Sequence, residues 1–242
     1  MITVLDRLVG AGAALLAAGA ALQVLGRRAG STAEERAARL PGDDLVVHPQ
    51  MVMDHAITVA ADREEVWPWL TQMGWHLGGW YTPTWVDRLL FPDSWASLDR
   101  LDPRLVRDLQ VGDVVPDGRP GTAHFRVAQV EPPELLVLGS VTHVPPGWAV
   151  RRGAHITWTW TIHLTALPGR ATRVHLRVRG RTSPGWLTAL YVATIVPSDV
   201  VMSRGMLHGL KARAGARRAP RESGRAPLDQ ELYLERDRRA RA

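Results

Sequence analysis

The feature that most constrains the fold is a stretch of alternating residues, AHITWTWTIHLTALPGRATRVHLRVRGRT, at positions 154–182. In its first half apolar side chains alternate with threonine and histidine, and in its second half with arginine and histidine. The Pro-Gly-Arg sequence between the halves is typical of a turn. Alternation with a period of two indicates a strand with one buried face, so the stretch predicts an antiparallel hairpin.

The register of this hairpin follows from the same pattern. A turn centred on Gly169 puts every apolar side chain on one side, whereas a slip of one residue would turn arginines towards that side. The expected facing pairs are Trp160 with Val178, Ile162 with Leu176, and Leu164 with Val174. The apolar face then requires another element to cover it.

The segments around the hairpin supply further strands and the cover. Residues 51–61 alternate like a strand, and residues 121–143 predict two more strands on either side of Pro132-Pro133. Residues 62–74 predict a helix that starts with a capping box, in which Pro68 is expected to cause a kink or mark the effective start. Pro197-Ser198-Asp199 are expected to break the last apolar stretch and begin a helix over about 199–213. This order of elements predicts an α+β layer arrangement.

Several motifs in order resemble one known superfamily. They are ADREEVWPWLTQMG, GGWY, LQVGDVVP, VAQVEPPELLVL and SDVVMSRGMLHGLKARA, which lie between residues 50 and 213. Together they are similar to the actinobacterial branch of the SRPBCC superfamily, which includes START-like proteins, polyketide cyclase/dehydrases and lipid-transport proteins.

The resemblance implies a helix-grip fold, in which a curved antiparallel sheet wraps around a long C-terminal helix with a hydrophobic cavity between them. The superfamily holds carriers, cyclases, hormone receptors and co-chaperone-like modules, so the fold does not determine the function. We expect binding or transport of a hydrophobic small molecule or lipid as the first hypothesis. A cyclase/dehydrase-type enzyme acting on an apolar or polyketide-like substrate, and a protein-interaction module using the outward Arg173–Arg179 face, are the alternatives.

The candidate ligand-binding residues are mostly aromatic, as in many small-molecule pockets. The stretch QMGWHLGGWYTPTW at 72–85 is expected either to cap the core or to form an aromatic entrance to the cavity. The ligand-binding candidates are Trp75, His76, Trp80, Tyr81, Trp158, Trp160, Met202 and Met206.

No catalytic motif stands out, so an enzyme is the less favoured interpretation. If the protein is an enzyme, the candidate acid–base residues are His55, His76 and His143. The absence of cysteine excludes disulfides and thiolate chemistry. His163 and His175 would face each other on the outer side of the hairpin without an evident third ligand, so we expect neither a metal nor another cofactor.

The first 28 residues contain an uncharged run, LVGAGAALLAAGAALQVL, at 8–25, followed by Arg27 and Arg28. Its length is near the minimum for a membrane span. We expect a membrane anchor with the domain in the cytoplasm, because the arginines follow the run. One alternative is a cleaved secretory signal. The other is a helix packed on the domain or on a partner, and in that case we expect the protein to be cytoplasmic.

The positive charge is concentrated at the C-terminus. Ten basic and five acidic residues from Lys211 onwards account for +5 of the formal net charge of +6, and this tail lacks apolar periodicity. We expect a mostly disordered tail, and the alternative is a weak electrostatic hold on anionic lipid or nucleic acid. We expect no specific nucleic-acid partner, since the domain has no basic surplus of its own. The expected organisation is an apolar helix at 1–28, a linker at 29–50, the helix-grip domain at 51–213 and the tail at 214–242.

Overall fold

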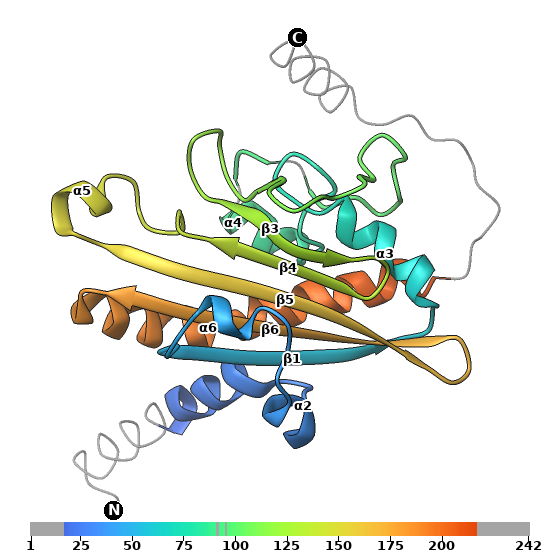
Figure 1. Cartoon of the computed structure of the whole chain (residues 1–242), viewed down its shortest axis with the longest axis horizontal. Coiled ribbons are helices and arrows are strands. Elements are labelled where there is room, and N and C mark those ends of the chain that lie inside the picture. The colour runs from blue at the N-terminus through green and yellow to red at the C-terminus, as the bar shows by residue number, and fades with distance from the viewer. Residues whose placement is uncertain (1–16, 91, 95, 217–242) are drawn as a thin grey trace, which may run out of the picture.

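The computed structural model describes residues 17–90, 92–94 and 96–216, and these form a sheet covered on one face by a long helix (Figure 1). The sheet has six antiparallel strands in the order β1-β6-β5-β4-β3-β2. The helix is α6, near the end of the described chain. This is an α+β architecture consistent with a helix-grip-like fold, which confirms the predicted fold class.

The strands are longest where the sequence alternates most regularly. Their bounds are β1 Met51–Val59, β2 Val114–Pro116, β3 His124–Glu131, β4 Leu135–Ser140, β5 His155–Leu167 and β6 Ala171–Ser183. In the β5–β6 hairpin Trp160 pairs with Val178 and Ile162 with Leu176, and Leu164 pairs with Val174. The predicted register is therefore confirmed.

The shorter helices connect and flank the sheet. They are α2 Ala33–Ala37, a 3-10 turn at Asp43–Leu45, α3 Arg63–Thr71, α4 Thr84–Leu90 and α5 Trp148–Arg152. The predicted capping box of α3 is present between Asp62 and Glu65. Pro68 lies inside α3 instead of marking its start. Because proline has no N–H, the carbonyl of Glu64 one turn earlier lacks its helical hydrogen bond. Glu64 is exposed, so water can hydrogen-bond to this carbonyl instead.

The prediction that the last helix begins at about residue 199 is wrong, because α6 runs over Gly185–Ala214 and contains Pro197. The helix packs against β1 and β6. Pro197 removes one backbone hydrogen-bond donor from the helix. The packing on the sheet, and a hydrogen bond from the Ser198 hydroxyl to the carbonyl of Ile195, stabilise the helix at this point. The contacts of α6 with the sheet therefore outweigh the tendency of Pro197 to interrupt a helix.

The apolar faces of the sheet and of α6 form the core. Ile162, Leu164, Leu176 and Val178 of the hairpin are fully buried, as are Met206 and Leu210 of α6. The helix and the inner face of the sheet thus enclose the apolar side chains that the alternation placed together.

The outer face of the sheet is covered by the segment that the sequence presented as a linker. The guanidinium of Arg177 donates to the carbonyls of Glu35, Arg36 and Ala38, and pairs with Asp43 at 2.9 Å. Arg173 pairs with Glu35 at 2.6 Å. Residues 30–47 therefore occupy the arginine-rich face that the partner-binding hypothesis assigned to another protein.

Residues 17–28 form a helix beside α6 (Figure 1). The side-chain amide of Gln23 donates to the carbonyl of Val192 at 2.6 Å. Gly26 lies so close that a Cβ atom there would be 1.8 Å from the Val196 carbonyl oxygen. The end of the predicted anchor therefore packs on the domain, whereas residues 1–16 and most of the predicted tail, 217–242, lie outside the described residues.

Candidate functional site

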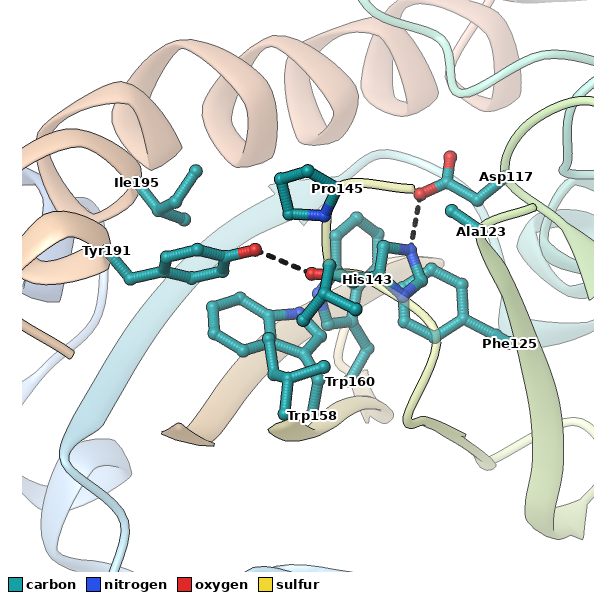
Figure 2. A pocket seen from close by; sticks show the side chains of 11 residues that line it. Asp117, Ala123, Phe125, His143, Pro145, Trp158, Trp160, Tyr191 and Ile195 are labelled. Carbon is teal, nitrogen blue, oxygen red and sulfur yellow. Dashed lines mark hydrogen bonds and ion pairs between the residues drawn. The ribbon is translucent and has the colours of Figure 1, made fainter. Parts of the chain in front are cut away.

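A cavity of about 340 Å³ lies between the sheet and α6 and is partly open to solvent (Figure 2). Its walls come from β3, β5, the segment after β4 and α6. The lining residues are Asp117, Ala123, Phe125, His143, Val144, Pro145, Ile156, Trp158, Trp160, Tyr191 and Ile195. Its volume is in the range of small-molecule pockets, and most of its wall is apolar or aromatic.

The strand geometry places Trp158 and Trp160 in this wall. They are two residues apart on β5, so both side chains point to the inner face. Trp160 is in edge contact with Trp80 and in tilted contact with Phe125, with ring centroids 5.4 and 5.2 Å apart. These ring contacts hold the aromatic wall in place.

One end of the cavity is polar. Nε2 of His143 lies 2.8 Å from Oδ2 of Asp117, and Nδ1 of His143 lies 2.7 Å from Oγ of Ser140 (Figure 2 shows the Asp117 contact). The side chains of His143 and Asp117 are only 19% and 17% exposed. Burial raises the pKa of the Asp117 carboxyl, and the hydrogen bond with His143 opposes this shift.

A tyrosine of α6 ties this polar end to the helix. The hydroxyl of Tyr191 donates to the backbone carbonyl of His143 at 2.7 Å (Figure 2). Burial raises the pKa of this hydroxyl, so it remains a donor at neutral pH. The bond fixes the segment that follows β4 against the helix and closes one side of the cavity.

The structure brings together only part of the predicted site. Trp158, Trp160 and His143 line the cavity, and Trp80 lies behind Trp160. The other candidates lie elsewhere. Trp75 and Tyr81 are buried, with the Tyr81 hydroxyl donating to the carbonyl of Trp69.

His76 packs on the ring of Trp75, and burial lowers the pKa of the His76 imidazole. Met206 is buried in the core of α6, and Met202 is half-buried on the same helix. Neither methionine is among the residues that line the cavity.

His55 is buried, but it pairs with another residue instead of lining the cavity. Its Nε2 lies 2.6 Å from Oδ2 of Asp199 on α6, and the Ser203 hydroxyl donates to Oδ1 of the same carboxylate. This group links β1 to α6 inside the core.

The two histidines that face each other across the hairpin do not act together. His163 and His175 are paired in the register, but Nε2 of His175 is bonded to Asp54 at 2.8 Å. The contact with the Asp54 carboxylate ties this side chain to β1.

Sequence reasoning missed Asp117, Phe125, Tyr191 and Ile195. Asp117 directly follows β2, and the available signal was a carboxylate immediately after the LQVGDVVP motif. Tyr191 and Ile195 were missed because the helix was expected to start after them. Their spacing of four residues on an apolar helix was the available signal.

Comparisons with known proteins identify no family. No family model matches the chain, and no curated protein matches it. Among solved structures, the Mll3558 protein of Rhizobium loti is 16% identical with a TM-score of 0.38, covering 67% of this chain and 96% of its own.

Two other solved structures are similar to this chain. Hypothetical protein jhp0584 of Helicobacter pylori is 11% identical with a TM-score of 0.41, covering 73% of this chain and 95% of its own. CalU16 of Micromonospora echinospora is 18% identical with a TM-score of 0.29, covering 67% and 85%. Sequence identities and TM-scores this low do not support any conclusion about function.

Proposed function

We propose that the protein is an SRPBCC-like binding protein for a hydrophobic small molecule or lipid. The observation that carries the proposal is the cavity between the sheet and α6, with its aromatic wall and one polar end. Burying an apolar ligand there would remove about 25 cal/mol of unfavourable hydration for each Å² of apolar surface. The polar end would orient a ligand that carries one hydrogen-bonding group.

Native mass spectrometry of the full chain after mild extraction tests this proposal. The wild-type protein is expected to retain or exchange an apolar ligand. The variant Ile195→Trp fills the cavity from α6 and is expected to lose the bound mass. Ala193→Trp is the matched control, because Ala193 is exposed on the same helix. Absence of any apolar ligand from the wild type, or equal retention by both variants, would contradict the proposal.

We also propose that the chain is held at a membrane through residues 8–25. Apolar side chains are exposed on the helix at 17–28 and on α6, which contacts it through Val192. Six of them are 39–45% exposed: Leu22, Val24, Leu25, Trp186, Leu190 and Val201. Arg27 and Arg28 at the end of the run favour a cytoplasmic position for the domain.

The length and composition of α6 alone are only weak evidence for a membrane span. Among the described residues it is the one helix whose length and composition would be sufficient for a span. The core helix of a soluble domain has the same properties, and α6 packs against β1 and β6. The membrane proposal therefore rests on the N-terminal run and on the exposed apolar side chains that lie on it and on α6.

A further inference from the structure

Three polar side chains at the end of the cavity form a continuous hydrogen-bonded chain. Ser140 ends β4, His143 lies three residues later, and Asp117 follows β2. Oγ of Ser140 is 2.7 Å from Nδ1 of His143, whose Nε2 is 2.8 Å from Oδ2 of Asp117. Asp117 and His143 line the cavity, whereas Ser140 lies behind His143.

The protons of this chain can be arranged in two ways that satisfy every group. In the first, Ser140 donates to Nδ1 of His143, and the Nε2 proton is donated to an ionised Asp117. In the second, the carboxyl of Asp117 is protonated and donates to Nε2, while Nδ1–H donates to Ser140. The hydroxyl of Ser140 then turns to Oγ1 of Thr142, which is 3.0 Å away and itself donates to the carbonyl of His124. The second arrangement holds one more proton than the first, so the chain can accept a proton without leaving a buried group unpaired.

Ser140 is not placed as a nucleophile. Its oxygen accepts the backbone N–H of Thr142 and contacts His143 and Thr142 Oγ1. The group that faces the cavity is the carboxyl of Asp117. The other titratable side chains that line the cavity are His143 and Tyr191, and the Tyr191 hydroxyl is bonded to the carbonyl of His143.

A second observation indicates what a ligand would carry. Nε1 of Trp160 is buried and has no hydrogen-bond partner within the described part of the chain. Trp160 lines the same cavity, and its side chain belongs to a residue only 7% exposed. A buried donor without a partner is costly, and a carbonyl oxygen of a ligand would satisfy it.

We propose that Asp117, positioned by His143 and Ser140, is a general base that removes a proton from carbon in a flat, apolar carbonyl compound bound against the aromatic wall. The carboxylate takes the proton next to the carbonyl. The C–H electron pair becomes the C=C bond of the enolate, whose oxygen accepts from Trp160, and the proton remains on Asp117 until it is returned. This inference rests on the proposed function, because the substrate must first enter the cavity.

The test uses the full-length protein and 5-nitrobenzisoxazole, a flat aromatic probe. A base that removes its C–H proton breaks the N–O bond and releases a coloured cyanonitrophenolate. Wild-type protein is expected to exceed acetate at equal concentration by on the order of 100-fold, the lower range for a positioned base. Asp117→Asn is expected to reduce the rate to background. Asp113→Asn is the matched control, since Asp113 is exposed nearby in the chain, and it should retain the wild-type rate.

His143→Gln tests the positioning role through the pH profile. Because the bond with His143 lowers the pKa of Asp117, weakening it should move the midpoint of the rate–pH profile to higher pH. An unchanged midpoint would overturn the role of His143. This readout also serves if Asp117→Asn fails to fold.

Binding of the probe is measured separately by quenching of tryptophan fluorescence. Binding without turnover above acetate, or turnover unchanged in Asp117→Asn, overturns the proton-transfer proposal and leaves the binding function intact. If neither the nitro probe nor any apolar ligand binds, the proposed function fails first and this inference fails with it.

Discussion

At the scale of single residues, Gly180 determines where Trp158 can lie. It pairs with Trp158 across the hairpin, and a Cβ at position 180 would be 2.3 Å from Cζ3 of the indole. We predict that Gly180→Ala displaces this ring, changes the cavity wall and destabilises the protein by about 1–3 kcal/mol, the usual cost of overpacking. Urea unfolding and ligand retention measure the two effects.

Gly139 provides the control for Gly180. It lies on β4, and a Cβ there would meet only Ala128 Cβ at 3.9 Å, an ordinary contact. Gly139→Ala should therefore leave both ligand retention and unfolding close to wild type. Equal effects of the two alanines would show that the contact with Trp158 does not set the cavity wall.

The buried pair of His55 and Asp199 makes a second prediction at this scale. Without the imidazole, the carboxylate of Asp199 would remain in the core with the Ser203 hydroxyl as its one hydrogen-bond partner among the described residues. We predict that His55→Ala lowers the free energy of unfolding by about 3–5 kcal/mol, the typical cost of breaking a buried pair. Urea titration followed by circular dichroism measures the loss.

An exposed ion pair serves as the comparison. Arg119 and Asp93 are 68% and 53% exposed, so Asp93→Ala should cost less than about 1 kcal/mol. If His55→Ala costs no more than Asp93→Ala, the link between β1 and α6 through Asp199 does not stabilise the fold.

At the scale of elements, the contact of α2 with the outer face of the sheet should depend on pH. Hydrogen bonding to Arg173 lowers the pKa of Glu35 to about 2. A carboxyl with a lowered folded-state pKa stabilises the protein above its unfolded pKa, near 4.5, and this contribution is lost as the pH falls towards 2. We predict that Glu35→Gln costs about 1–2 kcal/mol at pH 7, allowing for solvent screening, and that the difference from wild type disappears at low pH.

Unfolding curves between pH 7 and pH 2 check this prediction. Glu64→Gln is the control, because Glu64 is exposed on α3 and should give a pH dependence close to wild type. A constant difference between wild type and Glu35→Gln over the whole range would mean that the pair with Arg173 is not the source of the effect.

Elements were predictable where the local pattern and the tertiary environment agree. The β5–β6 register followed from alternation alone, since any slip would turn Arg173 or Arg177 into the core. The start of α6 was not predictable, because Pro197 and Asp199 give a strong local signal for a helix start that packing on β1 overrides. The carboxylate of Asp199 was interpreted as an element boundary, although its role is the bond to His55.

At the scale of the whole molecule, the two tryptophans of the aromatic wall could be predicted, whereas of the polar end only His143 was a candidate and its partners were not. Trp158 and Trp160 lie on one strand, so their direction follows from residue parity. Asp117, His143 and Tyr191 belong to three separate segments, and only the sheet order and the position of α6 bring them together. No spacing within the sequence predicts that these three side chains lie close together.

The same scale includes the relation of the N-terminal run to a membrane. Ala17 lies near the middle of residues 8–25 and is exposed in the described helix. An arginine there should not disturb the domain, but it would cost about 2.5–3.5 kcal/mol at the centre of a bilayer. We predict that Ala17→Arg releases the full-length chain from carbonate-washed membranes.

Ala37→Arg separates a membrane effect from a simple effect of charge. Ala37 is exposed on α2, outside the apolar run, so this variant should remain in the membrane pellet with the wild type. Because Gln23 and Gly26 hold the end of the run against α6, loss of the membrane should leave the fold of the domain intact. Release of the wild type, or retention of Ala17→Arg, would contradict the proposal that the run holds the chain in a bilayer.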